Sequence, residues 1–257
     1  MTAIFEVQHL YFAYSNHDVL QNMNFALLQG KFYGILGPNG CGKTTLLDIL
    51  SGYRKVNRGD IMLRGKNINT YPKHELAKII SVVAQQTEIH FPYTVQEIVM
   101  MGRYPYIDRF SQPSKTDYDF VYSIMEQTDI LSFAHQSVTQ LSGGEKQRVL
   151  FARAMAQNTD ILMLDEATAN LDIHYTLTLL DWVSMSRHTK TIIAVMHDIN
   201  LAARYCTDFL FMKDGKLIHM ESVDEILNAD YIHEVYDVHA KIYFESFINA
   251  KQVVYKR

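Results

Sequence analysis

The chain has 257 residues, of which 48% are hydrophobic and 20% charged, a balance typical of folded globular proteins. This length allows one large domain or two small ones. A formal net charge of −4 argues against a broad basic face that binds nucleic acid. The two cysteines, Cys41 and Cys206, are far apart, which disfavours a disulfide framework and favours a reducing compartment.

The hydrophobic pattern of the sequence does not predict a membrane-embedded chain. Residues 1–6 lack the basic start and apolar run of a signal peptide. No apolar stretch approaches the ~18 residues needed to cross a bilayer. If this protein works at a membrane, we therefore expect another chain to do the crossing.

The first predicted elements are strands. Residues 4–28 alternate apolar and polar side chains in short runs around a turn at 15–18, which predicts antiparallel strands. A compact apolar strand is expected at 31–36, and a helix from Gly42 or Lys43 to Leu50. Further apolar runs at 80–84, 161–164 and 191–196 predict buried, parallel strands.

A different region separates the strand at 80–84 from the strand at 161–164. Between residues 88 and 141, the patterns at 95–102 and 114–128 predict helices, and prolines at 92, 105 and 113 mark breaks in helical structure. The chain is therefore expected to form an α/β core interrupted by a mostly helical insert.

Residues 37–44 match the pattern GxxxxGK[ST] in full, between a predicted strand and a predicted helix. Glycines let successive backbone N–H groups point at phosphate oxygens, and the helix adds its positive end. Lys43 would reach the β- and γ-phosphates. Cys41 could serve redox or metal chemistry, or could fill space and point away from the phosphates. The predicted ATP-binding residues here are Gly37, Pro38, Asn39, Gly40, Cys41, Gly42, Lys43, Thr44 and Thr45.

The strand at 161–164 ends in two acids, Asp165 and Glu166. An ionised carboxylate at a strand's end needs a partner, and a magnesium ion bound to phosphate provides one. Asp165 would hold that ion through water, and Glu166 would orient or deprotonate the attacking water. The alternative is a strand that ends in a solvated acidic turn.

A second glycine pair occurs in the segment Leu-Ser-Gly-Gly-Glu-Lys-Gln-Arg at 141–148. It is expected to open a helix that runs to about residue 156, with Ser142 as N-cap and Glu145 completing a capping box. Gly143 and Gly144 do not favour that helix, since glycine costs roughly 1 kcal/mol relative to alanine in a helix interior. We expect them to let another group approach the backbone.

This segment resembles the signature sequence of ABC-type ATPases, and the other motifs follow in the order found in that family. Tyr14 matches the aromatic residue that stacks on adenine, with Phe12 as a nearby competitor. Gln85 matches the glutamine that senses magnesium and the γ-phosphate, although Gln86 is adjacent. His197 matches the switch histidine; a lone histidine is otherwise more often a core residue.

The D-loop of the family is matched by Ala169, Asn170, Leu171 and Asp172. Ala169 stands where a serine is common, and Ala84 stands where many relatives have proline before the glutamine. Neither position carries a catalytic group, so we expect activity to survive while coupling between nucleotide sites could differ.

The resemblance implies a P-loop NTPase (RecA-like) α/β core with an N-terminal antiparallel β subdomain and an inserted α-helical subdomain. Residues 1–257 would form one ABC ATPase domain, with 1–87 and 146–257 as the core and about 88–145 as the helical subdomain with the signature loop. ATP hydrolysis would use Glu166 as general base with Lys43, Gln85 and His197. The implied cofactor is Mg²⁺, bound with ATP by Thr44, Gln85 and Asp165.

In this family two ATPase subunits associate head to tail, and each ATP lies between one phosphate loop and the other subunit's signature loop. One of each is present here, which implies a homodimer. The trans contact would come from Leu141, Ser142, Gly143, Gly144 and Glu145.

Residues 94–105 resemble a segment of the ATPases that serve importers of iron siderophores, haem and cobalamin, and residues 227–238 resemble their short C-terminal ending. This implies two copies of a membrane permease and, indirectly, a periplasmic or surface substrate-binding protein. The ATPase would sit peripherally on the cytoplasmic face of the bacterial inner membrane. The expected permease contacts are Arg103, Tyr104 and Tyr106.

Two kinds of alternative remain. Within transport, the cargo could be a free metal ion or an oxyanion such as molybdate, or the partner could be an exporter. ABC ATPases of DNA repair insert long coiled coils or zinc hooks between the phosphate loop and the signature. Here about 100 residues intervene without a heptad run or a CxxC motif, so no nucleic-acid partner is expected.

Overall fold

The computed structural model describes residues 2–15, 17–85, 89, 91–169 and 171–257. Contacts divide the chain into two compact units, Met1–Tyr71 with Val183–Arg257, and Pro72–Trp182. The boundary between Trp182 and Val183 falls within helix α6 (Ile173–Ser186). Within the described residues, no helix is both long and apolar enough to span a bilayer.

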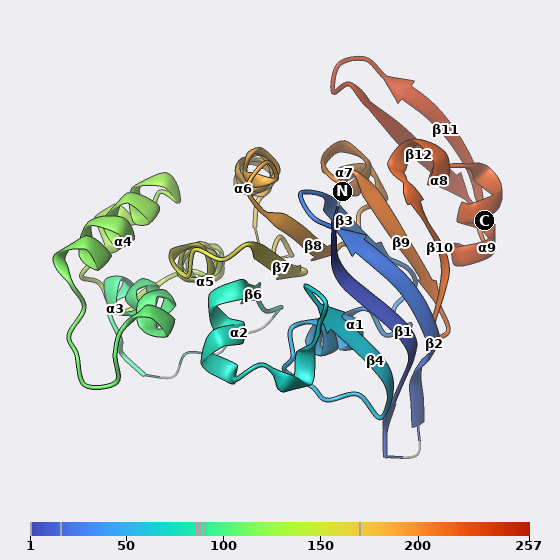
Figure 1. Ribbon diagram of the computed structural model, residues 1–257. Coiled ribbons are helices and arrows are strands. Elements are labelled where there is room, and N and C mark those ends of the chain that lie inside the picture. The colour runs from blue at the N-terminus through green and yellow to red at the C-terminus, as the bar shows by residue number, and fades with distance from the viewer. Residues whose placement is uncertain (1, 16, 86–88, 90, 170) are drawn as a thin grey trace. The chain divides into compact units, whose positions relative to one another are not determined.

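The first unit begins with an antiparallel sheet, coloured blue to cyan in Figure 1. The strand order is β2-β1-β4-β5, formed by β1 (Ala3–Tyr14), β2 (His17–Leu28), β4 (Arg58–Leu63) and β5 (Lys66–Asn67). Side chains such as Phe5, Val7 and Leu10 are buried, while their neighbours Glu6 and Gln8 are exposed. The alternating pattern at residues 4–28 therefore predicted β1 and β2 correctly, whereas β4 and β5 were not predicted.

A second group of strands in this unit carries the phosphate loop. Strand β3, with all five residues buried, runs parallel to both β8 and β9, and β10 is antiparallel to β9. A strand buried on both faces needs apolar residues throughout, which explains its unbroken apolar run. The strands are β3 (Phe32–Leu36), β8 (Thr191–Val195), β9 (Asp208–Lys213) and β10 (Lys216–Ser222).

The remaining elements of the first unit are short helices and a C-terminal hairpin. The helices are α1 (Lys43–Leu50), η1 (Ile68–Thr70), α7 (Ile199–Tyr205), α8 (Val223–Ile226) and α9 (Ala229–Tyr236). Strands β11 (His239–Glu245) and β12 (Ala250–Lys256) pair antiparallel. The Asn200 side chain fixes this hairpin to α7, since it bonds both the N–H (2.7 Å) and the carbonyl (3.2 Å) of Val253.

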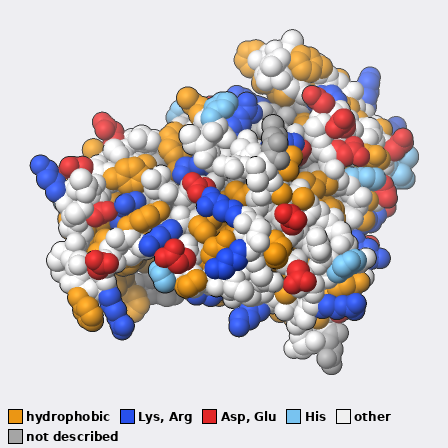
Figure 2. Space-filling view, in the orientation of Figure 1, with side chains coloured by type: hydrophobic (Ala, Val, Ile, Leu, Met, Phe, Trp, Pro, Cys, Tyr) orange, Lys and Arg blue, Asp and Glu red, His pale blue; other side chains and the backbone are white. Residues whose placement is uncertain are grey.

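The far end of the hairpin is apolar. Figure 2 shows hydrophobic side chains gathered there, and Phe244 and Phe247 are both exposed. The hairpin strands were not among the elements predicted from the sequence.

The second unit is mainly helical. Helices α3, α4 and α5 pack on one another, and β6 pairs with β7 in parallel register from Ile80↔Ile161 to Val83↔Leu164. The elements are α2 (Lys73–Ile79), β6 (Ile80–Val83), α3 (Val95–Met100), η2 (Met101–Tyr106), α4 (Lys115–Gln127), η3 (Leu131–Phe133), η4 (Val138–Gln140), α5 (Gly143–Ala156) and β7 (Ile161–Asp165).

The predicted helix at 95–102 is shorter than expected. Helix α3 ends at Met100 and continues as the 3₁₀ helix η2. Pro105 explains the change, since it cannot continue an α-helical hydrogen-bond ladder. Gly102 has a packing role instead: a Cβ there would stand 2.2 Å from the backbone oxygen of Arg153, so only glycine permits this approach of α5. The helix predicted at 114–128 is α4, with Ser114 as its N-cap.

Candidate nucleotide-binding site

The phosphate loop connects the buried end of β3 to helix α1, as the sequence predicted. Gly37 and Gly42 adopt positive φ values of 153° and 100°. A Cβ on Gly37 would stand 2.0 Å from the Met212 backbone oxygen, and one on Gly42 would stand 2.8 Å from Leu20. Both glycines are therefore required by the close approach of neighbouring strands as well as by their dihedral angles.

Lys43 is almost completely buried at the start of α1, with 6% of its surface exposed. Its Nζ donates hydrogen bonds to the carbonyl oxygens of Gly37 (2.8 Å) and Pro38 (2.9 Å). A buried ammonium requires acceptors, and the loop's own carbonyls supply them here. The lysine charge is thus held within the loop, where phosphate oxygens could serve as further acceptors.

The other side chains of the loop divide by exposure. Asn39, Gly40 and Thr44 are exposed, whereas Cys41 is 5% exposed. Burial raises the pKa of the Cys41 thiol, an effect that Lys43 opposes. A buried, protonated thiol suits packing better than redox or metal chemistry.

Of the two candidates for adenine stacking, Tyr14 is the accessible one. Its side chain is 40% exposed, while Phe12 is 7% exposed and meets the Tyr14 ring edge to face at 4.9 Å between centroids. The Tyr14 hydroxyl lies 3.5 Å from the Thr45 hydroxyl, on the second residue after Lys43. The ring of Tyr14 is therefore held beside α1, the helix that follows the phosphate loop.

His197 emerges at the same sheet edge as the phosphate loop. Strands β3 and β8 are parallel, with Ile35 opposite Val195, and the Met196 N–H donates to the Ile35 carbonyl at 3.2 Å. His197 is the next residue and is exposed. The carboxyl ends of parallel strands meet at one edge, which explains why these distant motifs converge.

In the second unit, β7 ends in the predicted pair of acids. Asp165 is 5% exposed. Glu166 has φ = 49°, a conformation that non-glycine residues adopt rarely and that costs of order 1–3 kcal/mol. The Gln85 Nε2 donates to Glu166 Oε2 at 2.6 Å. Two motifs separated by 81 residues thus meet directly, on the side chains that the sequence singled out.

The D-loop residues that can be described form a turn after Glu166. The Ala169 N–H donates to the Glu166 carbonyl at 3.0 Å, and Leu171 N–H to Thr168 at 3.1 Å. Asp172 accepts from the Tyr175 N–H at 2.9 Å, at the start of α6. The predicted D-loop residue Asn170 and the alternative glutamine Gln86 lie outside the described residues.

The signature loop has the capping box that the sequence predicted. Ser142 Oγ accepts from the Glu145 N–H (3.3 Å), and Glu145 Oε2 accepts from the Ser142 N–H (2.7 Å). Leu141 is buried, whereas Ser142 and Gly143 are exposed. Among the described residues, and apart from its chain neighbours and the backbone of its own helix, no atom lies within 4 Å of a Cβ added to Gly143. Packing inside the chain therefore does not require glycine at this position.

Two residues of the same segment have roles that the sequence did not reveal. Gln147 Nε2 donates to the Ala167 carbonyl at 3.0 Å, so the signature helix is tied to the residue after Glu166. Arg148 donates to the Asp129 carbonyl at 2.7 Å and lies 4.1 Å from the centre of the Tyr175 ring. Both residues belong to the signature motif, but their hydrogen-bond partners are about 20 residues away in sequence, so no local pattern predicted these contacts.

The three expected permease contacts differ in their surroundings. Arg103 has 16% of its side chain exposed and is engaged internally, by Asp117 (3.0 Å) and the Ala156 carbonyl (3.0 Å). The Arg103 guanidinium also covers the Tyr106 ring at 4.4 Å. Tyr104, at 58% exposure, is the most accessible of the three.

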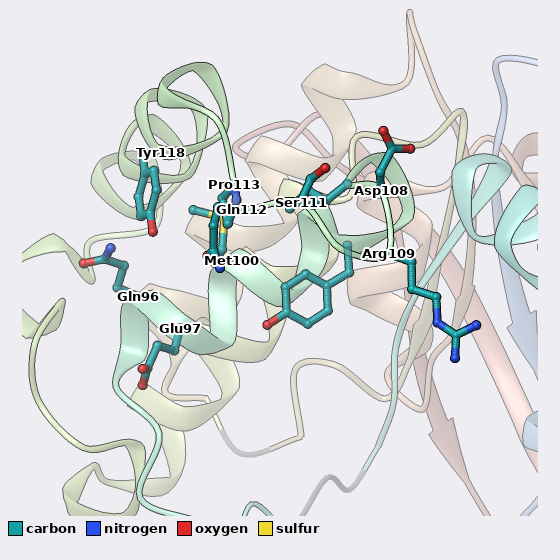
Figure 3. A pocket seen from close by; sticks show the side chains of 11 residues that line it. Gln96, Glu97, Met100, Asp108, Arg109, Ser111, Gln112, Pro113 and Tyr118 are labelled. Atoms are coloured by element: carbon teal, nitrogen blue, oxygen red, sulfur yellow. The ribbon is translucent and has the colours of Figure 1, made fainter.

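Tyr104 helps to line a cavity of about 490 Å³ in the second unit. Figure 3 shows Gln96, Glu97 and Tyr118 on one side of it and Asp108 and Arg109 on the other. Backbone of α3, of α4 and of the segment between η2 and α4 thus surrounds a cavity with both apolar and charged walls.

The residues predicted to bind magnesium have suitable chemistry. Thr44 offers a hydroxyl, Asp165 a carboxylate, and Gln85 an amide oxygen, because its nitrogen already donates to Glu166. Oxygen donors of these kinds are those that Mg²⁺ prefers, and the ion normally completes its shell with water and substrate phosphate. Across the described part of the chain, no cluster of three or more His, Cys, Asp or Glu residues could hold a metal without such help.

Comparisons with known proteins agree with this arrangement. The family model described as ABC transporter matches residues 20–169. Ferric enterobactin transport ATP-binding protein FepC of Escherichia coli (strain K12) is 37% identical over 237 residues, covering 91% of this chain and 88% of FepC. Iron(3+)-hydroxamate import ATP-binding protein FhuC of Bacillus subtilis (strain 168) is 31% identical, with the same two coverages.

A solved structure has the same fold over the full chain. It is described as an inward-facing conformation of a metal-chelate type ABC transporter, and it matches with a TM-score of 0.85 and 26% identity. The match covers 100% of this chain and 98% of that one, which confirms the predicted α/β P-loop fold. With the family model matching more than half of its residues, this chain belongs to the ABC transporter family and is an ATP-binding subunit.

Proposed function

We propose that this chain hydrolyses ATP to drive an importer of metal chelates, such as iron siderophores, haem or cobalamin. The observation that carries the ATPase assignment is the Gln85–Glu166 hydrogen bond at the end of β7. It joins an amide to the carboxylate of a residue whose backbone is strained, which suits a group that must hold and deprotonate one water molecule. The cargo class is supported by the names of FepC and FhuC, which concern ferric enterobactin and iron(3+)-hydroxamate.

Each site residue has a separate role in this proposal. The loop from Gly37 to Thr45 binds the phosphates through its N–H groups, and Lys43 transfers its hydrogen bonds from loop carbonyls to phosphate oxygens. Tyr14 stacks on adenine. Glu166 is the general base, and Gln85 and His197 sense the γ-phosphate. Magnesium, held by Thr44, Asp165 and Gln85, would neutralise charge on the phosphates.

The functional unit is proposed to be a homodimer. The exposed signature loop carries a glycine that packing inside the chain does not explain. A helix N-terminus that begins at an exposed glycine is a suitable anion site, because its first N–H groups have no partner within the helix. Phosphate held by a second copy's loop would fill it, so ATP would join two subunits and hydrolysis would release them.

The permease is proposed to contact the second unit at the Tyr104 cavity. This cavity is large enough for a few side chains of a short helix, and its rim combines apolar and charged groups. Arg103 and Tyr106 would support the wall from within. Two permease copies and a periplasmic or surface binding protein complete the proposed importer, with this chain peripheral on the cytoplasmic face of the bacterial inner membrane.

Transport by the reconstituted complex tests the proposal. The chain would be co-purified with its permease, placed in lipid vesicles with ATP on the subunit's side, and supplied with binding protein and a ferric chelate. ATP-dependent uptake of the chelate is expected. Uptake of free metal ion or molybdate instead, or movement in the opposite direction, would favour the alternatives.

A substitution tests the permease contact. Tyr104→Ala should lower transport severalfold while the ATPase activity of the isolated subunit stays unchanged, because Tyr104 is not among the residues proposed to bind or hydrolyse ATP. Leu131→Ala, which alters an exposed apolar residue away from the cavity, is the matched control. Unchanged transport by Tyr104→Ala would remove the cavity from the proposal.

A further inference from the structure

Arg54 connects the phosphate-loop helix to the ring proposed to stack on adenine. Its Nε donates to Asp48 Oδ2 at 2.7 Å, and Asp48 lies in α1. The guanidinium carbon of the same arginine lies 5.0 Å from the centroid of the Tyr14 ring. One side chain thus contacts both the helix that follows Lys43 and the aromatic residue at the end of β1.

The backbone around Arg54 is fixed by the same aspartate. The Asp48 carbonyl accepts hydrogen bonds from the N–H groups of Tyr53 (3.0 Å) and Arg54 (3.2 Å) and from the Ser51 hydroxyl (2.8 Å). Asp48 therefore holds Arg54 at both its backbone and its side chain. Because this arginine is anchored twice, its position over Tyr14 requires little further ordering.

Tyr14 itself needs such support. It lies at the end of β1, is 40% exposed, and is followed by Ser15 in a left-handed turn with φ = 52°. Its backbone neighbour Ala13 donates to the Asn57 side chain at 2.6 Å, which fixes the main chain but not the ring. The ring is restrained by the Phe12 ring, the Thr45 hydroxyl and the Arg54 guanidinium.

We propose that Arg54 is a positioning residue for ATP, which holds the partly exposed Tyr14 ring beside α1 so that an ordered ring receives adenine. A planar guanidinium over an aromatic face is attracted to the ring's electron density. A ring already ordered loses less conformational entropy when the base stacks on it. This inference rests on the proposed adenine-stacking role of Tyr14.

The expected effect appears in binding of ATP and not in the chemical step. An exposed cation–π contact is worth about 0.5–1 kcal/mol, which corresponds to a factor of about two to five in affinity. Arg54→Gln should therefore raise the KM for ATP about two- to fivefold and leave kcat unchanged. Arg54→Lys, which keeps the charge, should recover part of the loss.

A base-free probe separates ring positioning from simple attraction of phosphate. Inorganic tripolyphosphate would be tested as a competitive inhibitor of the ATPase. Arg54→Gln should not change its inhibition constant, because tripolyphosphate has no base to stack. If the variant weakens tripolyphosphate as much as ATP, Arg54 acts on the phosphates and the proposal is overturned.

A matched control exists in the same sheet. Arg58 lies 5.1 Å from the Tyr11 ring centroid, so it forms the same kind of contact without an anchor on α1. Arg58→Gln should leave the KM for ATP unchanged. Asp48→Asn, which keeps Arg54 but removes its anchoring charge, should raise the KM in the same direction by a smaller factor.

A double substitution decides the outcome. Tyr14→Ala should raise the KM for ATP about fivefold or more, as loss of base stacking does elsewhere. In that background Arg54→Gln should add nothing, and an additive effect would overturn the inference. A lower KM in Arg54→Gln would also overturn it, because the arginine would then compete with adenine. If Tyr14→Ala itself leaves the KM unchanged, the proposed role of Tyr14 fails instead.

Discussion

The two glycine-rich loops of this chain each lead into a helix, yet their glycines meet different neighbours. In the phosphate loop, a Cβ on Gly37 would collide with the Met212 carbonyl at 2.0 Å. In the signature loop, a Cβ on Gly143 would meet no atom of the described residues within 4 Å, its chain neighbours and its own helix backbone apart. The first glycine is required by the fold of one subunit. The second has no such requirement, and a surface outside the chain would explain it.

The largest expected effect comes from removing the general base. Glu166→Gln should slow ATP turnover by about 10²- to 10⁴-fold, because the amide cannot accept the proton of the attacking water. ATP should then remain bound and a stable dimer should accumulate, which size-exclusion chromatography with ATP would detect. Normal turnover by this variant would show that Glu166 is not the base.

Substitution at Gly37 tests the intrachain requirement. Gly37→Ala should lower the free energy of unfolding by about 2–4 kcal/mol, from the collision with Met212 together with the dihedral strain. Denaturant unfolding of the purified subunit measures this. Gly40→Ala is the matched control, since Gly40 also has a positive φ of 81° but open space around it. It should cost only the strain, about 1–2 kcal/mol. Equal losses would remove the collision from the explanation.

Substitution at Gly143 should have the opposite sign on stability. Gly143→Ala should raise the free energy of unfolding by up to about 1 kcal/mol, because alanine favours the first turn of α5. In the Glu166→Gln background it should also reduce ATP-dependent dimerisation, which analytical ultracentrifugation measures. Lys115→Ala, at the equivalent first position of α4, should leave the dimer intact. A Gly143→Ala variant that still dimerises normally would contradict the interpretation that Gly143 contacts a second subunit.

The sequence predicted those features whose signals are local. The phosphate loop, the capping box of Ser142 and the buried strand before Asp165 were all found where expected, because motif spacing and hydrophobic period determine them. Arg103 was different. Its partners Asp117 and Ala156 are 14 and 53 residues away, so nothing near it in the sequence indicated that it is engaged internally.

The C-terminal hairpin was missed for a related reason. Its strands contain exposed aromatic residues, among them Phe244 and Tyr255, so they do not follow the usual inside–outside alternation. The hairpin is fixed instead by Asn200, 53 residues before Val253. The roles of Gln147 and Arg54 likewise depend on contacts that only the folded chain brings together. The division of the chain into a core and an inserted subdomain at residues 88–145 stays a prediction.

The smallest expected effect concerns the charge on the signature loop's capping box. Hydrogen bonds from the Ser142 side chain and backbone lower the pKa of Glu145 below its ordinary value of 4.5. A lowered folded-state pKa means that the ionised cap stabilises the fold above about pH 4.5 and that this contribution is lost as pH falls through the folded-state pKa. Glu145→Gln can form the same box without a charge. The melting temperature of the wild type should therefore exceed that of the variant at pH 7, and the difference should shrink below pH 4.5. A difference that stayed constant with pH would show that the charge of Glu145 adds nothing to the cap, and the exposed signature loop would then owe its shape to hydrogen-bond geometry alone.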